Sequence, residues 1–180
     1  MTKTIAIIAG EPNSISSEII FKSWKIRKKF LHKSFFVIGS FKLLNLQKKR
    51  LKYKIQLKKI NENFKRNDLA GNKLPIYDIG YNQNSAFEKV STKSNFYIFN
   101  CFNAAIKFIK RKKVQGLINC PVSKESLFKN KHQGITEFLS KKLGCKGKEV
   151  MLIYNDKLSV SPITTHISIR DVTKNISTNK

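Results

Sequence analysis

Short apolar runs that are each flanked by a turn and a helical pattern constrain the fold of this chain most strongly. Residues 4–9, 35–39 and 116–120 are such runs, and none of them shows a strict alternation of polar and apolar side chains. This pattern is typical of parallel strands that are covered on both faces. We therefore predict an α/β fold, a layered α/β/α arrangement with a largely parallel sheet.

Helical patterns follow the first two runs, and a longer one precedes the third. Residues 14–17 offer N-cap side chains for a first helix, and Ser40 is expected to cap a second helix that runs to Leu46. The strongest helix is predicted over residues 94–112, because its apolar residues recur at helical spacing. The predicted apolar face of the first helix consists of Ile15, Ile19, Ile20 and Trp24. That of the strongest helix consists of Phe99, Phe102, Ala105, Ile106 and Ile109.

Shorter segments complete the expected order. Residues 74–80 are predicted to form an edge strand, because Pro75 has no N–H group to donate to a ladder. Residues 150–154 and 158–165 are predicted to pair through a turn at residues 155–157. A possible strand is expected at residues 55–57. Two short helices are expected, one near Ser123 and one at residues 136–143, and a last helix is expected to begin at Arg170.

The net charge of +25 would by itself suggest an anionic partner. The lysines, however, occur in nearly every segment, and arginine is scarce. A dedicated nucleic-acid surface more often concentrates its basic residues in a stripe with interleaved aromatic residues. We expect only nonspecific attraction to nucleic acid, and a noncatalytic basic nucleic-acid-binding module is kept as the alternative from another functional class.

The cysteines and the apolar runs bear on the compartment. Cys101, Cys120 and Cys145 form no CxxC pair, so the sequence indicates neither a zinc ribbon nor a disulfide framework, and reduced, mostly buried thiols are expected. No apolar run approaches the ~20 residues of a membrane span. The first apolar run is too short for the core of a signal peptide. We expect a cytoplasmic protein with no membrane partner.

Few catalytic signatures are visible in the residues themselves. The first strand is not followed by GxGxxG, and no GxxxxGK[ST] occurs. His166 ends an apolar strand at the edge where open α/β sheets bind ligands, although a purely structural histidine remains an alternative. Thr136 and Glu137 begin a helix whose N–H groups could receive an anion, although an ordinary helix cap explains them equally well. No catalytic residue can be assigned from these patterns.

Four segments, in order, resemble the 4-hydroxythreonine-4-phosphate dehydrogenase family. Residues 5–12 resemble its first strand and Gly-Asp/Glu-Pro turn, and residues 116–124 resemble its strand that ends in Pro-Val/Ile-x-Lys. Residues 134–139 resemble its Gly-His-Thr-Glu-Phe/Tyr-Leu motif. Residues 150–152 and 164–172 resemble its Met-Met-Leu and Thr-Thr-His-x-x-Leu-Arg-Asp-Val elements, of which the second is the most specific.

The resemblance implies a fold, a reaction and cofactors. Residues 1–180 would be the N-terminal portion of a two-domain, isocitrate/isopropylmalate dehydrogenase-like subunit, truncated and without a clear internal boundary. The subunit would form a homodimer with a site shared across the interface. The implied reaction is the oxidation, with decarboxylation, of 4-phosphooxy-L-threonine to 3-amino-2-oxopropyl phosphate in pyridoxal phosphate biosynthesis. NAD or NADP and a divalent metal (Zn, Mg or Co) are the implied cofactors.

The resemblance also implies roles for individual residues. His166 matches the first of the family's three metal-ligand histidines, and Thr136 matches a substrate-binding residue. Ile135 replaces the family's substrate-binding histidine, and a substrate oxygen left unpaired there would cost ~1–3 kcal/mol. The alternative within the enzyme class is a dehydrogenase of another phosphorylated hydroxy acid, such as phosphothreonate. The other two metal histidines come from the half of the family's sequence that these 180 residues do not match, so the chain is expected to be incomplete as an enzyme.

Overall fold

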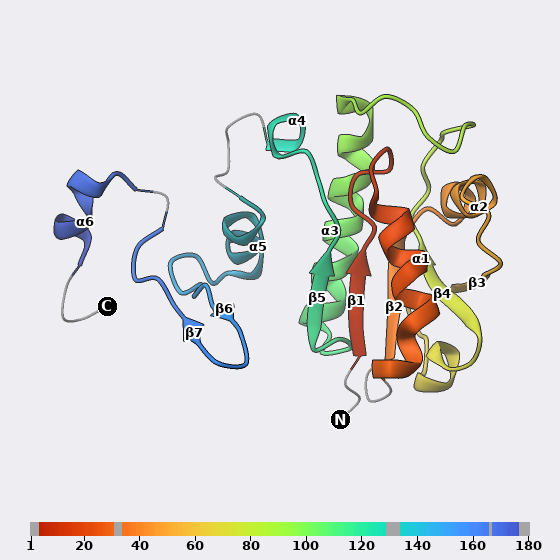
Figure 1. The fold of residues 1–180 in the computed structure, drawn as a ribbon, viewed down its shortest axis with the longest axis horizontal. Helices are drawn as coiled ribbons and strands as arrows, with labels where there is room; N and C mark the ends of the chain where they lie inside the picture. Colours follow the sequence, from red (N-terminus) through yellow and green to blue (C-terminus); the bar gives the residue numbers. More distant parts are fainter. Residues whose placement is uncertain (1–3, 31–33, 129–133, 166, 177–180) are drawn as a thin grey trace. The chain divides into compact units, whose positions relative to one another are not determined.

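A computed structural model describes residues 4–30, 34–128, 134–165 and 167–176 of the chain. These residues fall into two compact units, which divide the chain at residues 129 and 130. The first unit contains a five-stranded sheet with helices on its faces (Figure 1). The second contains helices and a short β-hairpin, whose strands have two residues each. None of the helices in the described ranges is both long and apolar enough to cross a membrane.

The sheet of the first unit is parallel throughout, as predicted. Its spatial order is β3-β4-β2-β1-β5, so the first strand of the chain lies next to the last strand of the sheet. Every pair of neighbouring strands runs in the same direction. The strands are β1 (Thr4–Ile8), β2 (Ser34–Gly39), β3 (Gln56–Ile60), β4 (Lys73–Asp78) and β5 (Gly116–Asn119).

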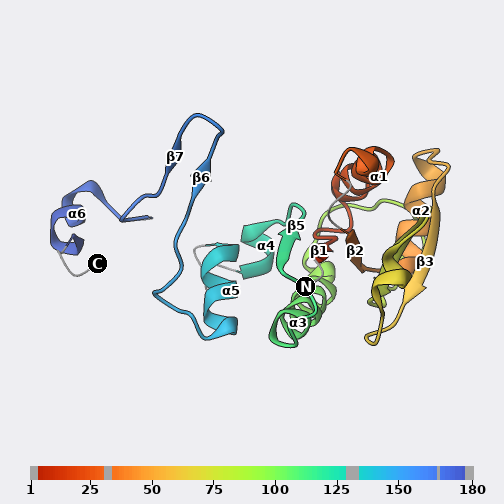
Figure 2. The same ribbon diagram turned by 90° about the horizontal axis from the view of Figure 1, so that it is seen from below.

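Helices lie on both faces of this sheet, which confirms the layered arrangement. Helix α3 lies on one face and α1 on the other (Figures 1 and 2). The Ser40 hydroxyl accepts a hydrogen bond from the Leu43 N–H at 3.3 Å, so the predicted cap of α2 is confirmed. The helices of this unit are α1 (Ser16–Ile26), α2 (Phe41–Arg50), α3 (Asn95–Lys110) and α4 (Lys124–Phe128), with 3₁₀ turns at Arg27–Phe30, Arg66–Leu69 and Thr92–Ser94.

Each face of the sheet has its own core. On the α3 face, the ring of Phe36 from β2 lies 5.4 Å from that of Phe108 and 4.8 Å from that of Phe64. On the α1 face, Phe21 and Trp24 are buried in a cluster that includes residues of β1, β2 and β4. Successive residues of the strands point to opposite faces, so their continuous apolar sequences supply both cores.

In the first unit, the predicted position of one strand and the predicted face of one helix are wrong. The strand around Pro75 is not an edge strand, because β4 lies between β3 and β2. Its pairing with β2 begins at Ile76, so at Pro75 the strand has only β3 as a neighbour and the missing N–H group is tolerated. The predicted face of the first helix is also only half right. Ile15 and Ile19 are exposed, and Phe21 takes their place in the core beside Ile20 and Trp24.

The second unit contains α5 (Ile135–Leu143), β6 (Ile153–Tyr154), β7 (Ser159–Val160) and α6 (Ile169–Asn175). The predicted turn is confirmed, because the Asn155 N–H donates to the Leu158 carbonyl at 2.9 Å and the Leu158 N–H donates back at 3.2 Å. The two strands are shorter than predicted. Helix α5 ends at Gly144, whose φ of +77° is the left-handed conformation typical of a glycine helix end.

Candidate functional site

The turn that follows β1 touches the segment that follows β5 at the carboxyl edge of the sheet. Gly10 has a φ of +71°, and a Cβ atom at this position would lie 2.5 Å from the Pro121 carbonyl oxygen. The Glu11 N–H donates to the same oxygen at 2.9 Å. Only glycine allows this approach of the two backbones. Open parallel sheets bind their ligands at this edge, so the contact fixes two loops of a candidate site.

Glu11 is a buried carboxylate whose two oxygens are both engaged. One oxygen accepts from the Ser94 hydroxyl at 2.9 Å, and the other accepts from the Asn13 N–H at 3.2 Å. The residue is only 2% exposed, and burying a carboxylate without such bonds is strongly unfavourable. Glu11 therefore ties the turn after β1 to the start of α3. This positioning role was not predicted, although the Gly-Glu-Pro sequence marked the turn.

A second group of hydrogen bonds fixes the same turn to residues 83–88. The Asn13 side-chain oxygen accepts from the Gln83 amide and from the Glu88 N–H, both at 2.9 Å. The Gln47 amide donates to the Pro12 carbonyl at 2.6 Å and to the Ala86 carbonyl at 3.0 Å. The turn is therefore anchored from both sides, which gives its backbone a defined shape before any ligand binds.

Ser14 and Ser16 stand in this turn, and the structure accommodates them without strain. Their hydroxyl groups lie 2.7 Å apart, and the Ser14 hydroxyl donates to the Glu11 carbonyl at 2.8 Å. Among the described non-glycine residues only Lys52 and Lys112 have a positive φ. Neither serine needs a conformation that is reserved for glycine.

Thr136 lies in the first turn of α5, in the second unit. The helix predicted over residues 136–143 is confirmed and begins one residue earlier, at Ile135, after the N-cap Gly134. The Thr136 side chain is exposed and that of Ile135 is half-buried. The first N–H groups of a helix have no partner within the helix itself, and the exposed Thr136 hydroxyl lies at this helix start. The binding role of Thr136 stays a prediction.

The predicted metal ligand His166 lies outside the described residues. Within the ranges that the structure describes, no three His, Cys, Asp or Glu side chains are close enough together to hold a metal ion. The described residues therefore do not fit a metal site by themselves. A site of the predicted kind requires His166 together with ligands from elsewhere.

All three cysteines are free, as predicted, and two of them are buried. Burial raises the pKa of the Cys101 thiol to about 12 and that of the Cys120 thiol to about 11. Both groups remain protonated at neutral pH, and a protonated thiol is a poor nucleophile and metal ligand. Cys101 and Cys120 therefore act as small apolar side chains.

These raised pKa values predict a loss of stability in alkaline solution. Unfolding returns both thiols to a pKa of 9.0, so above pH 9 the unfolded chain releases protons that the folded chain keeps until pH 11 to 12. The free energy of unfolding should fall by ~1 kcal/mol per pH unit for each thiol in this window. Urea unfolding at about pH 8 and about pH 10.5 measures the fall. A Cys120→Ala variant should show a smaller fall, and an equal fall in both proteins would contradict the assignment.

Comparison with known proteins places the chain among longer relatives. The family model described as "Pyridoxal phosphate biosynthetic protein PdxA" matches residues 32–180. A 4-hydroxythreonine-4-phosphate dehydrogenase from Sulfurihydrogenibium sp. is 30% identical over 182 residues, which cover 98% of this chain and 53% of the relative. A D-threonate 4-phosphate dehydrogenase from Salmonella typhimurium is 31% identical over 183 residues, which cover 98% of this chain and 55% of the relative.

A solved structure is similar to this chain in fold. The crystal structure of a 4-hydroxythreonine-4-phosphate dehydrogenase from Burkholderia phymatum superposes with a TM-score of 0.84 at 21% identity, covering 99% of this chain and 55% of that chain. At this identity the likeness shows the fold alone. The chain spans about half the length of the relatives that it matches.

Proposed function

Because the chain belongs to the family of the pyridoxal phosphate biosynthetic protein PdxA, we propose that it is the N-terminal portion of an NAD(P)-dependent dehydrogenase that acts on a phosphorylated hydroxy acid. The match of the family model over residues 32–180 carries the proposal. The substrate is 4-phosphooxy-L-threonine, and the product after oxidation and decarboxylation is 3-amino-2-oxopropyl phosphate. This reaction belongs to pyridoxal phosphate biosynthesis in the cytoplasm.

The proposed role of Thr136 is to bind a substrate oxygen. Its exposed position in the first turn of α5 supports this role, because the Thr136 hydroxyl can donate to a substrate oxygen from there. His166 is proposed as a ligand of the divalent metal (Zn, Mg or Co). Such a cation would supply Lewis-acid chemistry to the oxidation of the substrate.

The turn after β1 is a rigid part of the candidate site at the carboxyl edge of the sheet. Glu11 holds the turn through Ser94, and Gly10 lets the turn approach Pro121. Neither contact requires a ligand. Because such a backbone is already ordered, none of the free energy of substrate binding is needed to order the loop. The remaining ligands of the metal and the substrate would come from beyond these 180 residues, in a homodimer with the site shared across the interface.

A specific observation supports a second candidate substrate. Relatives named D-threonate 4-phosphate dehydrogenase, at 31% identity, are as similar to the chain as those named 4-hydroxythreonine-4-phosphate dehydrogenase. Ile135, beside Thr136, cannot donate a hydrogen bond to the substrate. Phosphothreonate carries a hydroxyl group where 4-phosphooxy-L-threonine carries its amine, so the loss of a polar neighbour at residue 135 can shift the preference between the two substrates.

The two substrates can be compared in the completed enzyme, in which the chain is joined to the missing half of a relative. We expect NADH or NADPH formation with 4-phosphooxy-L-threonine. Thr136→Val should lower kcat/KM about 10- to 100-fold, as expected for the loss of one hydrogen bond worth ~1–3 kcal/mol. The control Thr173→Val alters an exposed threonine of α6 and should leave kcat/KM unchanged.

Other outcomes distinguish the candidates. A higher kcat/KM with phosphothreonate, reversed by Ile135→His, would identify the second substrate instead. Inactivity on both substrates, in a folded and metal-loaded protein, would contradict both candidates.

A further inference from the structure

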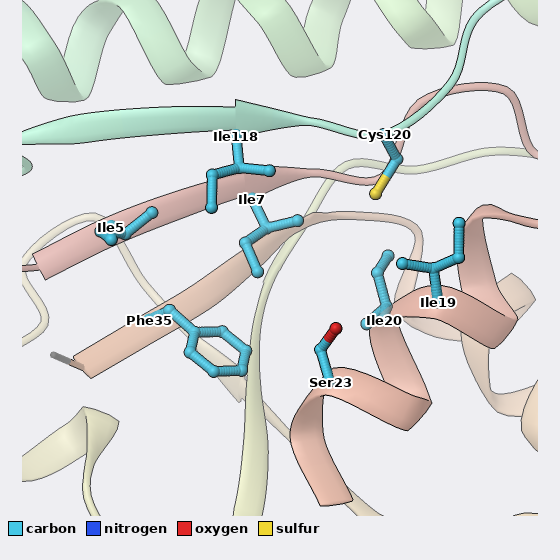
Figure 3. A pocket seen from close by; sticks show the side chains of 8 residues that line it. All are labelled: Ile5, Ile7, Ile19, Ile20, Ser23, Phe35, Ile118 and Cys120. Atoms are coloured by element: carbon cyan, nitrogen blue, oxygen red, sulfur yellow. The ribbon is translucent and has the colours of Figure 1, made fainter. Parts of the chain in front are cut away.

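Helix α1 borders two surfaces of the first unit that differ in character. One is an apolar groove of about 280 Å³ on the α1 face of the sheet, and none of the described residues that line it is charged (Figure 3). The other begins where α1 packs beside α2. There the ring of Phe21 from α1 lies 5.4 Å from the ring of Tyr53, which follows α2. This second surface is strongly basic.

Five of the seven residues from 48 to 54 are lysine or arginine, and a lysine of α1 lies beside them. The Lys25 Nζ is 5.3 Å from the centroid of the Tyr53 ring. The Tyr53 N–H donates to the Lys48 carbonyl at 3.0 Å, so the chain turns back at the end of α2 and keeps the run compact. All of these basic side chains are exposed except the half-buried Lys48. We call the six residues the α2 basic cluster: Lys25, Lys48, Lys49, Arg50, Lys52 and Lys54.

The charge of the α2 basic cluster is not balanced within the described ranges, where no acidic side chain forms an ion pair with it. Glu18 of α1 pairs instead with Lys22 at 2.6 Å. The basic residues at the end of α3 differ, because Glu62 pairs with both Lys107 and Arg111. The negative end of the α2 dipole supplies about half a charge, which is far less than six positive charges. The cluster is therefore available to an anionic partner.

Lys52 occupies a backbone conformation that favours glycine. Its φ is +57°, and it stands in the turn that ends α2, where glycine is the commonest residue. A lysine is less stable there than glycine, because its Cβ atom crowds the backbone. A strained position of this kind is more often found where a side chain serves binding than where it serves only the fold.

We propose that the α2 basic cluster binds the phosphate backbone of nucleic acid without regard to base sequence. A small phosphorylated ligand cannot balance six positive charges, whereas a duplex presents one negative charge per ~1.7 Å of its length. Tyr53 is half-buried against Phe21, so the cluster offers no fully exposed ring on which a base could stack. Sequence is read through base edges, and contacts to phosphate alone carry no sequence information. The nonspecific attraction expected from the net charge thereby acquires a defined location.

The same side chains argue against a membrane as the partner. A helix that lies in a membrane interface combines its basic residues with exposed apolar residues that enter the lipid. The exposed residues of the α2 basic cluster are all lysine or arginine, and Leu51 and Tyr53 between them are half-buried. Anionic phospholipid vesicles therefore serve as the competing ligand in the test.

Removal of three charges from the cluster tests the proposal in the 180-residue chain. Binding of a fluorescent 20-base-pair duplex is followed by anisotropy between about 50 and 200 mM salt. The triple variant Lys49→Gln, Arg50→Gln and Lys54→Gln should raise Kd at least ~10-fold at the lowest salt. It should also reduce the slope of log Kd against log salt by ~2–3, because about 0.9 counterions are released per phosphate contact. Two duplexes of unrelated sequence should bind equally within ~2-fold.

The matched control removes three exposed lysines from elsewhere in the first unit, as Lys89→Gln, Lys93→Gln and Lys110→Gln. Its Kd should rise less than ~3-fold, because only the net charge has changed. An equal loss of affinity in the two triple variants would show that net charge alone attracts the duplex, and it would overturn the proposal.

A single substitution separates binding from stability. Lys52→Gly removes one charge and relieves the strained conformation, so it should weaken duplex binding ~3-fold and reduce the salt slope by ~1 without lowering the thermal midpoint. Lys112→Gly is its matched control, because Lys112 has a φ of +54° in the turn that ends α3. It should also keep its thermal midpoint but leave the affinity within ~1.5-fold. Unchanged binding by Lys52→Gly together with unchanged binding by the cluster triple variant would contradict the proposal.

Two further outcomes would also overturn it. A preference of more than ~10-fold between the two duplexes would contradict recognition of the phosphate backbone alone. A cluster triple variant that loses binding to phosphatidylserine vesicles but not to the duplex would identify a lipid surface as the partner. Neither outcome bears on the dehydrogenase reaction, which is measured separately in the completed enzyme.

Discussion

Replacing His166 with alanine should remove the divalent metal from the completed enzyme and lower its turnover at least ~10³-fold. His166 is proposed as one of three histidine ligands, and loss of one leaves too few protein ligands for a catalytic cation. The transition-state stabilisation that such a cation supplies is several kcal/mol, which corresponds to a factor of this size. The measurements are kcat at saturating substrate and the metal content of the dialysed protein.

The matched control for this prediction is His32→Ala. The family resemblance gives His32 no role, so its replacement should leave both metal content and kcat close to those of the unaltered protein. Full metal content in the His166→Ala protein would contradict the ligand assignment. Lost metal with unchanged turnover would instead contradict the role of the metal in the reaction.

Replacing Phe36 with alanine should destabilise the first unit by ~3–5 kcal/mol. Phe36 is fully buried between the sheet and α3, and its ring packs against those of Phe64 and Phe108. Its removal loses the free energy gained by burying a large apolar side chain and leaves a cavity in a close-packed core. Urea unfolding at neutral pH, followed by far-UV circular dichroism, measures the change.

Phe96→Ala is the matched control, because Phe96 belongs to α3 but is 78% exposed. Its replacement should change the free energy of unfolding by less than ~0.5 kcal/mol. A Phe36→Ala protein that unfolds at the same urea concentration as the Phe96→Ala protein would show that the aromatic packing on the α3 face contributes little.

The order of strands and helices along the chain could be predicted from the sequence. The buried strands are continuous apolar runs, and the helices have apolar residues at helical spacing. The position of a strand within the sheet could not. Pro75 suggested an edge strand, but a proline affects only the ladder at its own position, and the partner strand β2 pairs from Ile76 onward. A local sequence pattern does not indicate which distant strands will be a strand's neighbours in the sheet.

The candidate site was predictable only where a residue type and its local element suffice. The helix that carries Thr136 was predicted to within one residue, and Gly144 marks its end. The positioning role of Glu11 was missed, because its partner Ser94 is 83 residues away in the sequence. A buried carboxylate and an exposed one look the same in a sequence, and only the fold brings the partner that permits burial.

The strand order also determines how long a newly synthesised strand waits for its neighbour in the sheet. β1 leaves the ribosome first, but its hydrogen-bonding neighbour on one side, β5, is made about 110 residues later. At translation rates of ~5–20 residues per second, this side of β1 waits roughly 5–20 s for its partner. During that time the nascent chain presents an apolar strand with an unpaired edge, which is the kind of segment that chaperones bind. Synonymous codons that slow translation between β2 and β5 should therefore lengthen the chain's dependence on chaperones.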